Sequence, residues 1–164
     1  DDVTWFAEQP FEIKYIHKRR EHRYIPDFLS VRNGRPWVTE VKPTAFADTE
    51  DNRRKAAVGA RWCEDRGWDY SVVTEIDIRV EPWLSNIKLL TYYARQNVST
   101  KLSEQVCHLL RESSDSIQLS KLCRTVLPDQ PHMARIAIFH LAFWHRLHLS
   151  MDEAIGPETL VWIT

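Results

Sequence analysis

The chain has 164 residues, a formal net charge of -1 at pH 7, and a hydrophobic fraction of 43%. That length allows one ordinary domain or two small ones, and the composition excludes a fully disordered chain. Its longest apolar stretches are about half as long as a bilayer span, so we expect no membrane segment. The three cysteines are widely spaced and form no CxxC pair, which argues against a disulfide framework and favours the cytoplasm.

The first half of the chain carries strand and turn signals. Four strands are predicted, over residues 11–16, 23–31, 37–41 and 70–74. Asn33-Gly34 is a strong hairpin signal between the second and third of them. Asp48 and Thr49 can cap a helix that continues to Gly67. The order of these elements predicts a mixed sheet with a helix on one face, in the α/β (α+β) class.

The second half carries helical periodicity. Helices are predicted over 84–93, 102–110, 117–126 and 131–148, followed by a strand over 160–163. Helices that end in a terminal strand fit a small winged-helix-like domain. Most charged residues precede Glu81-Pro82, and this shift in composition places two domains at residues 1–82 and 83–164.

Two acids and a lysine converge on one edge of the predicted hairpin. Asp27 follows Pro26 on one strand, while Glu40, Val41 and Lys42 end the next. Pairing of these strands brings Asp27 beside Glu40, and Glu40 and Lys42 share a face because side chains two apart on a strand point the same way.

This set of groups suits metal-assisted phosphodiester hydrolysis. The carboxylates of Asp27 and Glu40 and the carbonyl oxygen of Val41 are hard donors, which Mg²⁺ prefers, and Mn²⁺ can substitute. Lys42 would orient the attacking water or stabilise the negative charge of the transition state. The alternative is a pair of exposed strand carboxylates, because short strings of this kind also arise by chance.

An ordered set of motifs extends along nearly the whole chain. It comprises Trp5-Phe6, Glu8-Gln9-Pro10, Tyr24-Ile25-Pro26-Asp27-Phe28, Thr39-Glu40-Val41-Lys42-Pro43, Arg54-Lys55, Cys63 to Trp68, Val72 to Glu75, Ile78-Arg79, Asn86 to Leu90 and Tyr92-Tyr93. The set resembles the TnsA-type endonuclease subunit of heteromeric transposases, within the PD-(D/E)xK nuclease superfamily. The resemblance implies a restriction-endonuclease-like sheet core followed by a winged-helix-like domain.

The resemblance also implies roles and partners. Asp27 and Glu40 would be metal-binding acids and Lys42 the catalytic lysine. The family cuts the non-transferred strand at transposon ends, on double-stranded DNA, beside a DDE-type transposase subunit and an ATPase regulator. The family has a further catalytic glutamate on a helix upstream of the Glu8-Gln9-Pro10 stretch, and no residue of this sequence matches it. We interpret Glu8 as structural rather than as a metal ligand.

The unmatched glutamate leaves two alternatives open. The sequence is a truncated form, or part of the catalytic site has been lost and the chain is a non-catalytic adaptor that docks partners and DNA. A stand-alone restriction or repair nuclease of the same superfamily is a third hypothesis.

The basic residues are clustered rather than numerous. Contacts to the DNA backbone are predicted for Lys18, Arg19, Arg20, Arg23, Arg53, Arg54 and Lys55. The alternative is a solvated hairpin tip and an exposed first helical turn. A net charge near zero argues against a nucleic-acid partner, but a site that gathers acids for a metal contributes negative charge of its own. The sequence therefore predicts weak DNA affinity for the isolated chain.

Overall fold

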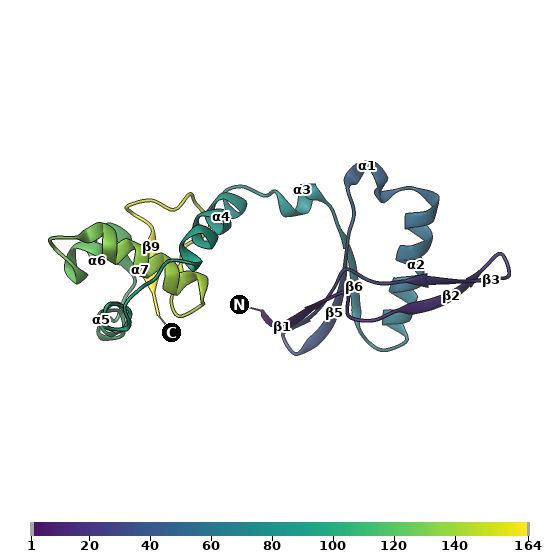
Figure 1. Ribbon diagram of the computed structural model, residues 1–164, viewed down its shortest axis with the longest axis horizontal. Helices are drawn as coiled ribbons and strands as arrows, with labels where there is room; N and C mark the ends of the chain where they lie inside the picture. The colour runs from purple at the N-terminus through teal and green to yellow at the C-terminus, as the bar shows by residue number, and fades with distance from the viewer. Residues whose placement is uncertain (1, 164) are drawn as a thin grey trace. The chain divides into compact units, whose positions relative to one another are not determined.

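The computed structural model describes residues 2–163. The chain forms two compact units, Asp1–Arg79 (unit 1) and Val80–Thr164 (unit 2), which are described separately (Figure 1). The sequence placed the boundary at Glu81-Pro82, and the structure divides the chain between Arg79 and Val80.

Unit 1 is built on a four-stranded sheet. Its strands are β1 (Val3–Glu8), β4 (Phe28–Arg32), β5 (Arg35–Val41) and β6 (Asp69–Val73), in the order β1-β4-β5-β6. The β1–β4 and β4–β5 pairs are antiparallel and the β5–β6 pair is parallel. The predicted mixed sheet, followed by helices in the restriction-endonuclease-like class, is confirmed. Strand β1 was not predicted.

A separate hairpin, β2 (Ile13–His17) and β3 (Arg20–Tyr24), extends from this unit. The prediction of one strand over 23–31 is wrong, because β3 ends at Tyr24 and β4 begins at Phe28. Pro26, in the gap, has no N–H to donate to a strand neighbour, so the chain leaves one sheet there and enters the other.

Helix α2 (Glu50–Glu64) packs beside β6 and is the main helix of unit 1 (Figure 1). The side chain of Thr49 caps its first turn by accepting a hydrogen bond from the N–H of Asn52 at 3.3 Å. The short helices α1 (Thr44–Ala47) and α3 (Glu75–Ile78), which the sequence did not predict, flank α2 and β6 in the chain.

Aromatic residues pack at one end of α2. The ring of Phe11 stacks on Trp62 with centroids 4.6 Å apart, and Trp68 meets Trp62 edge-on at 5.5 Å. Trp5, in contrast, is 51% exposed on the edge strand β1.

Unit 2 is helical, with a small antiparallel sheet. Its elements are α4 (Trp83–Ala94), α5 (Thr100–Glu112), β7 (Ile117–Gln118), α6 (Leu119–Val126), α7 (Pro131–Phe143), β8 (His148–Leu149) and β9 (Leu160–Trp162). The sheet has the order β7-β9-β8. The helix predicted to reach His148 ends at Phe143 instead, and His148 starts a strand. No described helix is long and apolar enough to cross a membrane.

Candidate active site

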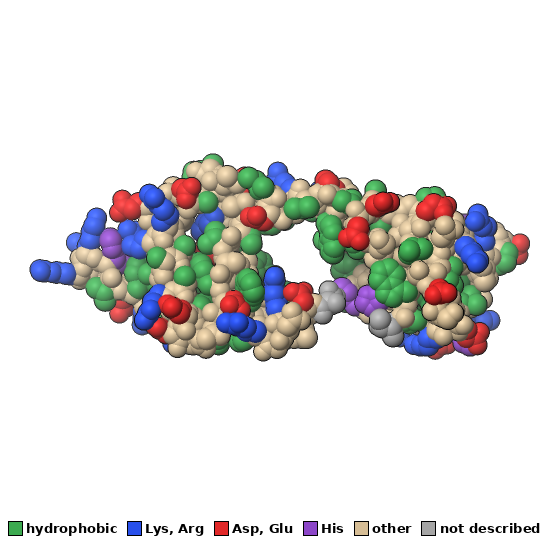
Figure 2. Space-filling model, turned by 180° about the vertical axis from the view of Figure 1, so that it is seen from behind, with side chains coloured by type: hydrophobic (Ala, Val, Ile, Leu, Met, Phe, Trp, Pro, Cys, Tyr) green, Lys and Arg blue, Asp and Glu red, His purple; other side chains and the backbone are tan. Residues whose placement is uncertain are grey.

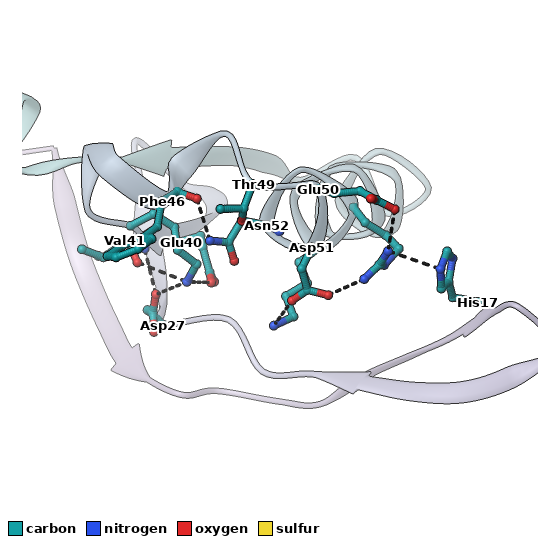
Figure 3. A network of polar contacts seen from close by, with 12 residues as sticks. His17, Asp27, Glu40, Val41, Phe46, Thr49, Glu50, Asp51 and Asn52 are labelled. Atoms are coloured by element: carbon teal, nitrogen blue, oxygen red, sulfur yellow. Dashed lines mark hydrogen bonds and ion pairs between the residues drawn. The ribbon is translucent and has the colours of Figure 1, made fainter.

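The strand register brings the two predicted acids together. Phe28 on β4 pairs with Thr39 on β5, so Asp27, one residue before β4, lies beside Glu40. Oδ2 of Asp27 accepts a hydrogen bond from the N–H of Val41 at 2.8 Å (Figure 3). This bond fixes the orientation of the Asp27 carboxylate at the end of β5.

The ammonium group of Lys42 contacts all three predicted ligand groups. It donates a short hydrogen bond to Oε1 of Glu40 and a bond of 3.2 Å to the carbonyl oxygen of Val41, and it lies 3.9 Å from Oδ2 of Asp27. One cation thus faces two carboxylates and a carbonyl oxygen within a single cluster (Figure 3).

The carboxylate of Glu40 is buried and accepts a hydrogen bond from Tyr24, which in turn contacts Tyr70. Glu40 is 4% exposed, and its Oε2 accepts a hydrogen bond of 2.8 Å from the hydroxyl of Tyr24. The hydroxyl of Tyr70 lies 3.0 Å from that of Tyr24. Burial raises the pKa of Tyr24 well above its ordinary value, and burial raises the pKa of Tyr70 to about 12. Both phenols therefore keep their protons at neutral pH and remain hydrogen-bond donors.

These tyrosines were not predicted as site residues. Tyr24 belongs to the motif that contains Asp27, and Tyr70 starts the strand predicted over 70–74. A signal was therefore present for Tyr24, but its bond to Glu40 and its contact with Tyr70 depend on three-dimensional packing. Gly59 on α2 makes room for it, because a Cβ atom there would lie 2.5 Å from Tyr70 Cε2.

Hydrogen bonds to backbone groups, made by neighbouring segments, hold the loops that carry the site. The N–H of Gln9 donates to the carbonyl oxygen of Asp27 at 2.9 Å, and the N–H of Lys42 donates to Val73 at 2.9 Å. Oε2 of Glu75 accepts from the N–H of Thr44 at 2.8 Å, and this bond lowers the pKa of Glu75. The stretch that contains Gln9 thus has a structural part in placing Asp27.

The predicted DNA contacts of the first half divide into exposed and paired residues. Lys18 and Arg19 form the exposed tip of the β2–β3 hairpin, and Arg20 begins β3. Arg23 lies 3.5 Å from Glu12. Figure 2 shows Lys and Arg side chains gathered over this hairpin, at the left end of the view, with acidic side chains among them. Within the described residues, no ion pair neutralises the charges of Lys18 and Arg19 at the tip.

Most of the side chains on α2 that were predicted to contact DNA already pair with other residues of the protein. Arg54 pairs with Asp51 and contacts Nε2 of His17 at 3.2 Å, and Lys55 pairs with Asp51 at 2.8 Å (Figure 3). Arg53 is exposed. The hydrogen bond with Asp51 raises the pKa of Lys55, and the charge of Glu40 adds a smaller contribution. Lys55 thus lies within electrostatic reach of the acids.

The donor set fits a hard divalent cation. Within residues 2–163, no group of three or more His, Cys, Asp or Glu side chains is arranged to hold a metal. The cluster instead combines two carboxylates, from Asp27 and Glu40, with the carbonyl oxygen of Val41. Mg²⁺ is commonly held by one or two carboxylates and keeps several waters. Two carboxylates that face one ammonium also leave a net negative charge, which favours a cation.

Comparison with known proteins gives a family match for the first unit. No curated protein matches the chain. Residues 1–75 match the protein family described as TnsA-like endonuclease N terminal, and this match contains Asp27, Glu40 and Lys42. The matched segment includes every strand of the unit 1 sheet and all of α2. Residues 1–75 of this chain are therefore similar to the TnsA-like endonuclease N-terminal family.

Proposed function

We propose that this chain is a metal-dependent DNA endonuclease that cuts the non-transferred strand at transposon ends by phosphodiester hydrolysis. The observation that carries the proposal is the convergence of Asp27, Glu40, the Val41 carbonyl and the Lys42 ammonium at one end of β5. The match of residues 1–75 to the TnsA-like endonuclease N-terminal family supports this reaction class, in a transposase system that acts on DNA.

Asp27, Glu40 and Val41 would hold Mg²⁺, or Mn²⁺ in its place. When bound, such an ion polarises a phosphate oxygen and lowers the pKa of a water molecule. The N–H of Val41 orients the Asp27 carboxylate, and the hydroxyl of Tyr24 occupies Oε2 of Glu40, which leaves Oε1 facing the cluster.

The flexible side chain of Lys42 can donate hydrogen bonds to the reacting atoms. In the structure its ammonium group donates to Oε1 of Glu40 and to the Val41 carbonyl. A cation held by these oxygens would replace the ammonium there, and its three donors would then be available to a phosphate oxygen or to the attacking water, where a compact cation stabilises developing negative charge.

The DNA and the partners belong to the same proposal. The duplex would contact the exposed cations of the β2–β3 hairpin and Arg53, while Arg54 and Lys55 would have to exchange internal ion pairs for phosphates. A DDE-type transposase subunit and an ATPase regulator would deliver the chain to the transposon ends, since a nearly neutral chain has little long-range attraction for DNA.

The proposal is tested by strand cleavage with the transposase partner present. A labelled duplex that carries the transposon ends bound by that partner is incubated with Mg²⁺. We expect Asp27→Ala and Lys42→Ala to lower the cleavage rate by about 100-fold or more, because the first removes a metal ligand and the second removes the cation that acts on the phosphate or the water. Asp65→Ala and Lys101→Ala, which alter exposed residues outside the cluster, should cut like the parent. Equal cutting by Lys42→Ala would refute the assignment of the site.

Calorimetric titration with Mn²⁺ separates the enzyme from a non-catalytic adaptor. We expect heat of binding that Asp27→Asn abolishes and Asp65→Asn leaves unchanged. An adaptor with a degenerate site would show no carboxylate-dependent binding. Cutting of duplexes without transposon ends, in the absence of any partner, would instead favour a stand-alone restriction or repair nuclease.

A further inference from the structure

Unit 2 contains a cavity of about 630 Å³ that has no part in the candidate active site. Its walls come from α4, α6, α7 and the segment 155–157. Its lining is mainly apolar and includes Leu89, Tyr93, Phe139 and Ile155. A volume of this size is typical of preformed ligand sites and accommodates a few side chains of a partner.

Two arginines stand at this cavity without acidic partners. Within residues 2–163, no carboxylate lies in ion-pair distance of Arg124 or Arg135, and none lines the cavity. Among the described residues, Arg124 donates a hydrogen bond only to Ser120, at a long distance of 3.4 Å. Burial raises the pKa of the Cys123 thiol, and the charges of Arg135 and Arg124 oppose this rise. Both guanidinium groups therefore act on the same buried position of the lining.

The wall formed by the segment after β8 is fixed in place. The side chain of Asn86, which is 2% exposed, donates to the carbonyl oxygens of Met151 and Glu153 at 3.2 and 2.8 Å. It also accepts from the N–H of Ile155 at 3.0 Å. One buried amide thus ties residues 151–155 to α4, so the cavity is preformed and a ligand need not order this wall.

The composition of α7 argues against duplex DNA as the occupant. Helix α7 follows α6 after a short turn, the position of the groove-reading helix in helix–turn–helix proteins. A reading helix needs several exposed polar side chains that reach base edges. In α7 the exposed residues are His132, Met133 and Arg135, and the helix has no Lys, Asn, Gln, Ser or Thr.

Helix α4 also covers one side of α7. The rings of Tyr93 and Phe139 meet edge-on with centroids 5.0 Å apart, and Nδ1 of His140 donates to the carbonyl oxygen of Tyr93 at 3.3 Å. A helix that is apolar on most sides and packed against its neighbours is a core element. Such a helix cannot enter a groove without losing this packing.

We propose that this cavity binds a peptide segment of a protein partner, in which an Asp or Glu side chain pairs with Arg124 and Arg135 while an adjacent large apolar side chain enters between Leu89, Tyr93 and Phe139. The unpaired guanidinium groups supply charge complementarity to the carboxylate, and bidentate pairing with arginine adds geometric specificity. The aromatic and aliphatic lining supplies the apolar contact that anchors such segments. This interaction is independent of the nuclease site.

The test is selection of displayed peptides against the whole chain. A phage library of random 12-residue peptides is panned on the parent protein after depletion on Arg124→Glu/Arg135→Glu. We expect enriched peptides with Asp or Glu within two residues of Leu, Phe or Trp. Fluorescence polarisation of the synthetic peptides should show binding at least tenfold weaker with the depleting variant. The matched control, Lys101→Glu/Arg111→Glu, reverses two charges on α5 outside the cavity and should change affinity less than twofold.

Three outcomes would overturn the proposal. The first is no enrichment over the depleted selection, and the second is a consensus without acidic residues. The third is binding of a 20-base-pair duplex to the parent, with an affinity that falls at least tenfold in Arg124→Glu/Arg135→Glu. This result would assign the surface to DNA. Circular dichroism verifies that the charge-reversed chain is folded. If the charge-reversed chain is not folded, the double variant Arg124→Gln/Arg135→Gln is used in its place, and the same criteria apply.

Discussion

At the residue scale, the candidate active site depends on side chains that are held rather than free. Glu40 is buried, and its two oxygens divide their contacts between the Tyr24 hydroxyl and the Lys42 ammonium. Asp27 is oriented by a backbone N–H of β5. Groups that support a metal ligand in this way commonly change metal affinity by 10- to 100-fold when they are removed.

We expect Tyr24→Phe to harm the site more than Tyr70→Phe does. The first change leaves Oε2 of the buried Glu40 without its donor, which costs about 1–3 kcal/mol of folding free energy. The second keeps the bond from Tyr24 to Glu40 and removes only the contact between the two hydroxyls, worth about 1 kcal/mol. Urea unfolding measures the free energies, and calorimetry with Mn²⁺ measures affinity, which should fall about tenfold in Tyr24→Phe. Equal effects of the two variants would show that the Tyr24 bond does not support Glu40.

Gly59 is expected to be required for the same arrangement. A Cβ atom at this position would lie 2.5 Å from Cε2 of Tyr70 and 3.1 Å from Cε1 of Tyr24, so at least one ring must move. Overpacking of this kind costs about 1–3 kcal/mol, which outweighs the gain in helix propensity of about 1 kcal/mol. Gly59→Ala should therefore lower the unfolding midpoint of unit 1. Gly156→Ala, in unit 2, is the comparison: its Cβ would meet nothing closer than 3.8 Å, so the unfolding midpoint of that unit should not fall through overpacking. An unchanged midpoint in Gly59→Ala would show that the rings adapt without cost.

At the element scale, the tip of the β2–β3 hairpin places two cations at strained backbone positions, which lowers its folding stability. Lys18 and Arg19 have φ angles of 47° and 61°. Tight two-residue turns with positive φ at both positions are best formed by Asn-Gly, because other side chains are strained there. The chain instead places two exposed cations at these positions. This choice is consistent with a role in contacting phosphates.

Replacing the tip by the preferred turn should separate stability from DNA binding. We expect Lys18→Asn/Arg19→Gly to stabilise unit 1 by about 1 kcal/mol, because it relieves the backbone strain of the turn. The same variant should lower the salt dependence of DNA binding by about 2 in the slope of log K against log salt concentration, through the loss of two phosphate contacts.

Fluorescence anisotropy with a duplex at several salt concentrations measures this slope. Arg61→Ala/Arg66→Ala removes two exposed cations near the other end of α2 and should leave the slope unchanged. An unchanged slope in the tip variant would exclude the hairpin tip from the DNA interface.

How far the sequence predicts these elements depends on whether the signals are local. The Asn33-Gly34 turn fixes the β4–β5 register, so the sequence could place Asp27 beside Glu40. The start of α2 follows from Thr49 and the acids of its first turn, whereas its end, expected at Gly67, lies at Glu64. The break at Pro26 was missed because the apolar pattern continues through it. The tyrosine pair and the unit 2 cavity depend on contacts between distant segments, which no local periodicity encodes.

At the scale of the whole molecule, the two units differ in how much core they bury. The buried hydrophobic residues that the structure describes in unit 1 are Ile13, Tyr24, Pro26, Val38 and Cys63. Unit 2 holds a larger continuous cluster that extends from Leu90 to Val161. Burial of apolar side chains contributes about 1.5–3 kcal/mol for each large residue. Unit 1 also carries two acids that face a single ammonium, which further limits its stability without a metal.

We therefore expect two thermal transitions, of which a metal raises only the lower. Calorimetry of the whole chain in EDTA should show unit 1 unfolding first and unit 2 at a higher temperature. A ligand at 100 times its Kd stabilises the folded state by about 2.7 kcal/mol. For a unit of about 80 residues this corresponds to a rise of about 11–22 °C in the midpoint. Saturating Mn²⁺ should produce this rise in the first transition and leave the second in place.

The double variant Asp27→Asn/Glu40→Gln is the control for this shift. It removes both carboxylate charges from the cluster, so Mn²⁺ should no longer move the first transition, while the second stays where it is in the parent. A single transition in EDTA would show that the two units unfold as one cooperative body. A shift that persists in the double variant, or that appears in the second transition, would place the metal outside the cluster of Asp27, Glu40 and Val41.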